Sequence, residues 1–199
     1  RQLHGQIREF PYPSLVVPAD GGDDRQATYT RYLLVAAGKH GAQALMSLRR
    51  LTECEARLHR AIEVLAEAPP RNRYACHALM LRGLLAMRRA RHEQARADWQ
   101  ASLGLAREAR AHSIVSSACL NLGILDRVQA NEASALQYLE RAYQVAEEHD
   151  IFRDVLAVLN ARAEFALRRH DWAGAQRFDE LLLRTALDND RRPQAAEAL

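Results

Sequence analysis

The stretch LNLGILDRVQANEASALQYLERA, residues 120–142, decides the fold of this chain. In it Gly123 is followed twelve residues later by Ala135, and then by Leu139 and Ala142 at helical spacing. The same offsets return in three other copies, which are Ala42, Cys54, Leu58 and Ala61; Gly83, Ala95, Trp99 and Ser102; and Ala163, Ala175, Asp179 and Leu182. A period near 40 residues is typical of stacked helix pairs, because one pair cannot bury its apolar face alone.

The repeats predict an all-α fold, a right-handed α-solenoid of about four stacked antiparallel helix pairs over residues 27–199. Capping and breaking residues put the pairs at about residues 27–68, 72–110, 112–149 and 152–188. Thr52 and Glu55 predict a capping box at a helix start, and Asp150 and Asp171 predict the caps of the fourth pair. Pro193 predicts the first turn of a capping or further helix over residues 193–199.

Small residues explain how the two helices of a pair come close together. Two antiparallel helices approach closely only where one of them offers glycine or alanine at the crossing. We therefore expect Gly83 to face Ala95, and Gly123 to face Ala135, within their pairs.

Residues 1–26 differ from the rest of the chain, because prolines and glycines forbid a regular helix through most of them. Their apolar centre, YPSLVVP, is extended in character. We expect an extended N-terminal arm that packs either on its own repeats or on a neighbouring molecule.

The composition is that of an ordinary soluble protein, with 199 residues, 48% apolar and 27% charged. No stretch approaches the roughly 20 apolar residues that cross a membrane, and the first residues lack a secretory signal, so we expect a cytoplasmic protein without membrane contact. The densest arginine cluster lacks interleaved aromatic residues for stacking on bases, so we expect no direct contact with nucleic acid. Its members are Arg82, Arg88, Arg89, Arg91 and Arg96.

Known catalytic and metal-binding motifs are missing from the sequence. The 8 histidines show neither an H-E-x-x-H motif nor a Cys/His ligand spacing, and there is no glycine-rich phosphate loop or nucleophile elbow. The 3 cysteines are widely separated within helical patterns, which is typical of small buried side chains. We therefore expect no enzyme activity, no cofactor and no metal.

The repeated positions resemble the tetratricopeptide repeat (TPR) family, whose motif W-x2-L-G-x2-Y is followed by A-x3-F. The matching residues are Leu122, Gly123, Ala135, Leu139 and Ala142 in the third copy, and Gly83, Ala95 and Trp99 in the second. Arg82 replaces the usual leucine in the second copy, and Ala163 replaces the glycine in the fourth. The period near 40 resembles the longer-helix variant of the MalT-like bacterial transcription regulators.

In the TPR family the first helix of each pair lines a concave groove, so the resemblance implies a partner-binding site at the matching positions. These positions are Met46, His77, Met80, Leu84, Met87, Arg88, Leu120, Ile124, Arg127, Asn160, Glu164 and Arg168. Methionine is flexible and suits an apolar partner segment, and the arginines would hold its acidic groups.

The resemblance implies a protein–protein interaction module that binds a protein or peptide in this groove, as the sensing or partner-docking region of a larger bacterial regulatory protein. The missing initiator Met at Arg1 also predicts a segment of a longer protein. Two alternatives stay open. One is a self-association scaffold, a homo-oligomer in which the arm of one molecule fills the groove of another. The other is a small-ligand sensor region of a MalT-like regulator, with Asn121, Asn160 and Glu164 as candidate polar residues.

Overall fold

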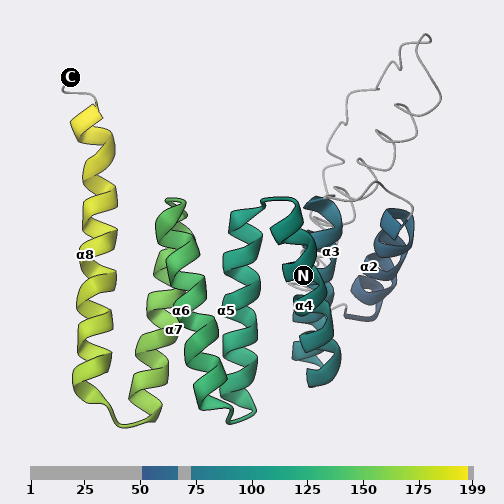
Figure 1. The fold of residues 1–199 in the computed structure, drawn as a ribbon, viewed down its shortest axis with the longest axis horizontal. Coiled ribbons are helices and arrows are strands. Elements are labelled where there is room, and N and C mark those ends of the chain that lie inside the picture. The colour runs from purple at the N-terminus through teal and green to yellow at the C-terminus, as the bar shows by residue number, and fades with distance from the viewer. Residues whose placement is uncertain (1–50, 67–72, 197–199) are drawn as a thin grey trace, which may run out of the picture.

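Seven α-helices stand side by side in the part of the chain that the computed structural model describes, residues 51–66 and 73–196. They are α2 (Leu51–Ala66), α3 (Arg73–Arg88), α4 (His92–Glu108), α5 (His112–Val128), α6 (Glu132–Glu148), α7 (Phe152–Arg168) and α8 (Trp172–Ala196). Figure 1 shows them as a row from α2 to α8, in which successive helices run antiparallel. The predicted all-α stack of helix pairs is confirmed. The N-terminal arm, the first predicted helix and Met46 lie outside the described residues.

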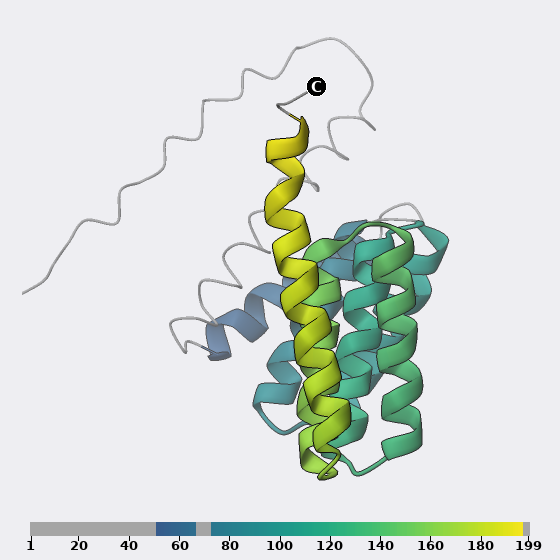
Figure 2. The same cartoon turned by 90° about the vertical axis from the view of Figure 1, so that its left-hand side faces the viewer.

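The row of helices has two layers. In the described residues, α5 contacts both α3 and α7, whereas α6 contacts neither α4 nor α8. The odd-numbered helices are thus closer to one another than the even-numbered ones, so the concave side of the row is the side of α3, α5 and α7. Figure 2 looks along the row from the α8 end.

The six helices from α3 to α8 are joined by five turns of one kind. Their left-handed residues, with φ between 50° and 59°, are Ala90, Arg110, Ala130, Asp150 and His170. After Ala130, the Asn131 N–H donates to the Asp126 carbonyl at 2.8 Å, and the Asn131 carbonyl accepts from the Ala135 N–H at 2.9 Å. One residue therefore ends a helix in a Schellman motif and begins the next. Since the five turns recur every 20 residues, each repeat of about 40 residues consists of two similar units, each made of one helix and one turn.

The structure corrects one of the two predicted caps. Asp150 takes the left-handed position of its turn, and Ile151 is the N-cap of α7 instead. Aspartate tolerates this conformation because its short polar side chain can form local hydrogen bonds. Asp171 caps α8 as predicted, since its Oδ1 accepts the Gly174 N–H at 2.9 Å.

In the second and third copies of the repeat, the two helices of a pair cross at a glycine. A Cβ added to Gly83 would lie 2.4 Å from Nε1 of Trp99, so Gly83 faces this indole and not Ala95. The indole fills the crossing point and donates a hydrogen bond to the Met80 carbonyl at 3.2 Å. A Cβ on Gly123 would lie 3.0 Å from Cγ of Leu139 and 3.2 Å from the Ala135 carbonyl oxygen, close to the predicted partner.

The last helix is longer than predicted. α8 continues from Trp172 through Pro193 to Ala196, whereas the sequence predicts a new helix at residue 193. The fixed φ of proline is compatible with a helix, and its missing N–H removes one main-chain hydrogen bond without having to end the helix. Although α8 has 25 residues, neither it nor another described helix is long and apolar enough to span a bilayer.

Ala130→Gly is predicted to stabilise the chain by up to about 1 kcal/mol, because glycine enters the left-handed region without the steric cost of a Cβ. Ala101→Gly is the matched control, since Ala101 is exposed within α4, where glycine costs about 1 kcal/mol. Urea unfolding followed by circular dichroism measures both variants. Equal losses of stability in the two variants would contradict the role assigned to the turn.

Gly83→Ala is predicted to lower the free energy of unfolding by about 1–3 kcal/mol, because the buried Trp99 ring must shift. Gly104→Ala is the control, since Gly104 is exposed in α4 and its added Cβ would meet nothing within 4 Å. In this control the free energy of unfolding is expected to rise by up to about 1 kcal/mol, because alanine has a higher helix propensity than glycine. Thermal unfolding compares the two, and a shift of the same sign in both would show that the Gly83–Trp99 contact does not set the helix spacing.

Candidate functional site

The described members of the predicted partner-binding site lie on the three odd-numbered helices. They are His77, Met80, Leu84, Met87 and Arg88 on α3; Leu120, Ile124 and Arg127 on α5; and Asn160, Glu164 and Arg168 on α7. The side chains on α3 and α5 are half-buried except for the exposed Arg88, while those on α7 are exposed. The apolar members of the site therefore all lie on α3 and α5, whereas α7 contributes only polar and charged residues.

The apolar members lie over the hydrophobic core. Met80, Leu84, Met87 and Leu120 pack against the main cluster of buried residues, which extends from α3 to α7. Leu84 also packs against a second cluster between α2 and α3. Ile124 is half-buried one turn after Leu120 on α5. Each of these side chains is partly covered by the chain and partly accessible.

A polar contact joins α5 to α7 within the predicted site. Arg127 Nη1 lies 3.0 Å from Glu164 Oε2, and Asn160 Nδ2 donates to Glu164 Oε1 at 3.1 Å. Arg127, predicted to hold a carboxylate of a partner, thus already holds one of its own chain. Arg88 and Arg168, at the ends of α3 and α7, have exposed side chains.

Three buried aspartates support the helices that carry the site, and none of them was predicted from the sequence. They are Asp98, Asp126 and Asp154, between 1% and 4% exposed. Asp98 accepts two hydrogen bonds from Arg82, at 2.9 Å from Nε and 2.6 Å from Nη2. Arg82 stands where the TPR motif has leucine, and Asp98 on the facing helix supplies the partner that this arginine needs. The sequence does contain a signal for Asp98, because the later repeats have the aromatic residues Tyr138 and Phe178 at the equivalent positions.

The other two carboxylates are also paired. Asp126 of α5 accepts hydrogen bonds from Arg96 of α4 and Ser134 of α6, so that one side chain joins three successive helices. Asp154 of α7 accepts from Ser117 of α5 at 3.1 Å. An unpaired buried carboxylate costs several kcal/mol, so these contacts favour one relative position of the helices.

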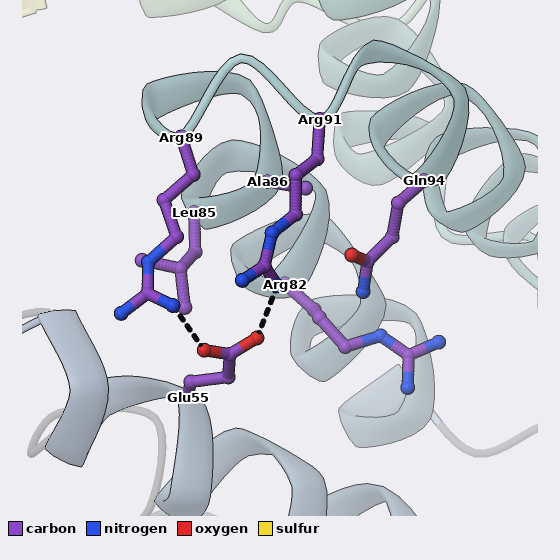
Figure 3. Close-up of a pocket in the computed structure, with 7 residues that line it drawn as sticks. All are labelled: Glu55, Arg82, Leu85, Ala86, Arg89, Arg91 and Gln94. Carbon is purple, nitrogen blue, oxygen red and sulfur yellow. Dashed lines mark hydrogen bonds and ion pairs between the residues drawn. The ribbon is translucent and has the colours of Figure 1, made fainter.

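Glu55 of α2 holds the turn between α3 and α4. Its carboxylate binds Arg89 and Arg91, the latter at 2.6 Å, as the dashed lines in Figure 3 show. The sequence predicts that Glu55 forms a capping box with Thr52, but the carboxylate goes to these arginines, and Thr52 Oγ1 accepts from Arg89 at 3.3 Å. The crevice around Glu55 has no room for a water molecule, so it is a structural contact and not a ligand site.

Arg162 of α7 lies between the two neighbouring helices, α6 and α8. Its guanidinium is 5.3 Å from the Tyr143 ring centre on α6 and 5.4 Å from the Phe178 ring centre on α8, and it pairs with Glu140. Burial lowers the pKa of Arg162 from its usual value, although the group stays charged. Beside it, an open recess on α6 is lined by Leu136, Gln137, Glu140, Arg141, Gln144 and Arg162. This recess lies outside the predicted site.

The cysteines serve packing. Cys54, Cys76 and Cys119 form no disulfide and are fully buried. Burial raises the pKa of the Cys54 and Cys119 thiols against the opposing effect of nearby arginines, which disfavours the reactive thiolate. Within the described residues, no group of three or more His, Cys, Asp or Glu side chains is placed to hold a metal ion.

The fold is similar to that of a solved protein. The crystal structure of aspartyl phosphate phosphatase F from Bacillus subtilis matches with a TM-score of 0.71 and 13% sequence identity, over 86% of this chain and 43% of that protein. This chain thus spans less than half the length of the phosphatase, and the likeness shows the fold alone, in support of a TPR-like helical repeat. No protein-family model and no curated protein match the chain. None of these findings supports the narrower resemblance to MalT-like regulators.

Arg82→Leu is predicted to lower the free energy of unfolding by about 3 kcal/mol, because it leaves the buried Asp98 carboxylate without its partner. The double variant Arg82→Leu/Asp98→Tyr installs the residues that the next repeat has as Leu122 and Tyr138. We expect it to recover most of that loss, since an apolar pair can replace a buried ion pair. Urea unfolding measures both, and a double variant less stable than the single one would refute this account.

Proposed function

We propose that this chain is a protein–protein interaction module, the partner-docking region of a larger cytoplasmic regulatory protein of bacteria, and that it is not itself an enzyme. The observation that carries the proposal is a set of half-buried apolar side chains on the neighbouring helices α3 and α5, which we call the apolar strip. It consists of Met80, Leu84, Met87, Leu120 and Ile124.

Partial burial suits these side chains to recognition. The core already restrains one side of each, so that less conformational entropy is lost when a partner covers the other side. Met80 and Met87 add flexible, polarizable side chains that adapt to the shape of an apolar partner. An amphipathic helix or an extended segment is the kind of partner that such a surface accepts.

Exposed arginines at the ends of two odd-numbered helices favour an acidic partner. Arg88 ends α3 beside Met87, and Arg168 ends α7. The planar guanidinium binds carboxylates through two parallel hydrogen bonds. We therefore expect an apolar segment with flanking Asp or Glu residues, whose affinity falls as salt screens the charges.

The fold supports the proposal in a general way. Stacked helical repeats present an extended, rigid surface that is well suited to binding along its length.

Ile124→Glu tests the proposal, because it puts a charge on the apolar strip. Leu84→Glu is less suitable, since Leu84 packs against two clusters of the core. Peptides that bind the chain are selected from a random phage-displayed library, and their dissociation constants are measured by fluorescence anisotropy. We expect Ile124→Glu to raise these constants at least about tenfold, which is about 1.4 kcal/mol.

Leu136→Glu is the matched control, because Leu136 is 39% exposed on α6 and lies off the apolar strip. We expect it to change peptide affinity less than about twofold. Circular dichroism checks that both variants keep their helices. If the selected peptides bind Ile124→Glu as tightly as the parent chain, the apolar strip is not the docking site.

A further inference from the structure

The outer side of α8 carries an apolar patch that no described helix covers. Leu183 is 60% exposed and Leu187 is 48% exposed, and the half-buried Ala186 lies between them. Among the described helices, α8 contacts α7 alone. Figure 2 shows α8 in front, with its outer side toward the viewer. We call Leu183, Ala186 and Leu187 the α8 patch.

The positions of the other even-numbered helices that correspond to Leu183 and Ala186 are covered by the helix that follows, whereas those that correspond to Leu187 are the exposed Arg107 and Glu147. Leu183 corresponds to Leu103 of α4 and Tyr143 of α6. Leu103 is 6% exposed in the cluster that α4 shares with α5, and Tyr143 packs against a cluster that contains residues of α7. Nearby Ala106 and Ala146 are 0% exposed. Leu183 and Ala186 therefore continue the surface by which each even-numbered helix contacts its neighbour, and Leu187 extends it with an exposed apolar side chain that α4 and α6 lack.

The patch is confined to one part of α8. Asp179, one turn before Leu183, is exposed, whereas its equivalents Trp99 and Leu139 are buried. The charged Asp179 therefore bounds the patch on this side, and its apolar side chains lie on the turns that follow. A partner needs to cover only about two helical turns, roughly 11 Å of the helix.

Opposite charges flank the patch on one side of the helix. Arg184 Nε lies 3.9 Å from Asp188 Oδ2, and both side chains are exposed. A second copy can be placed antiparallel to the first, related to it by a two-fold axis near Ala186. Asp188 of each copy then lies beside Arg184 of the other copy. The same axis places Ala186 of one copy opposite Ala186 of the other, and brings Leu183 of each copy within one helical turn of Leu187 of the other. The patch therefore complements itself in both hydrophobicity and charge.

We propose that the α8 patch is a homodimer interface, in which the α8 helices of two copies of this chain pair antiparallel. This interface is separate from the apolar strip, so each copy keeps its partner-docking surface. The patch is small compared with the roughly 800 Å² per partner of a stable interface, so the dimer is weak, with a dissociation constant on the order of 10–100 μM.

Sedimentation equilibrium of the 199-residue chain, at concentrations from well below to well above the expected dissociation constant, tests the proposal. We expect Leu183→Glu to weaken dimerisation at least about tenfold, because it brings carboxylates into the apolar contact. Leu181→Glu is the matched control and is expected to leave dimerisation unchanged. Leu181 is on the same helix at a position whose equivalents, Ala101 and Arg141, are exposed as well.

Charge reversal provides a second test that leaves the apolar contact intact. Arg184→Glu places a glutamate beside Asp188 of the partner subunit and is expected to weaken dimerisation about threefold. The double variant Arg184→Glu/Asp188→Arg exchanges the charges and is expected to restore it. Circular dichroism verifies the fold of each variant, and peptide binding at the apolar strip is expected to be the same in Leu183→Glu as in the parent chain.

A chain that stays monomeric at every concentration would overturn the proposal, and the patch would then suit a helix that continues the stack. A dimer that survives Leu183→Glu but is lost on deletion of residues 1–26 would also overturn it, in favour of association through the N-terminal arm. Neither result bears on the apolar strip, because peptide binding is measured separately.

Discussion

The five left-handed turns set the length and the level of the helices that they join. Each turn uses one residue to end a helix and begin the next, so α4, α5, α6 and α7 all have 17 residues. Helices of equal length, joined by equal turns, start and stop at matching levels, and contacts between neighbours recur at regular intervals. Alanine occupies two of these left-handed positions, Ala90 and Ala130, at a cost of about 1 kcal/mol each, which shows that the packing of the stack outweighs local backbone strain.

Within this frame, side-chain size and charge decide how the helices approach. Glycine stands where a large residue crosses, as at Gly83 under Trp99, and the fourth copy has Ala163 with the exposed Asp179 at the equivalent positions. No buried side-chain nitrogen or oxygen in the described residues lacks a hydrogen-bond partner. Paired polar groups of this kind add little net stability, but they disfavour other arrangements of the helices. The result is a firm support for two separate surfaces, the apolar strip and the α8 patch.

Much of the fold could be predicted from the sequence, because helix pairing depends on spacing along the chain. The recurrence of Gly123 and Ala135 at a period near 40 predicts the stacked pairs, and Asp171 marks a helix start. The left-handed turns escaped prediction, since their residues include alanine and arginine and not the usual glycine. The helix start predicted at Pro193 was wrong because proline, although favoured at a helix start, is also tolerated near a helix end at the cost of one hydrogen bond.

Spacing along the chain was enough to predict the repeat, the helical class and the helices that carry the candidate site. Which side chains are available on those helices depends on how the helices pack. Arg127 and Glu164 stand 37 residues apart and both belong to the predicted site, yet the structure pairs them with each other. Arg82 and Asp98 look like separate departures from the repeat until the helices bring them together. The physical reason is that periodicity shows which side of a helix is apolar, whereas hydrogen bonds depend on the rotation and height of one helix against the next.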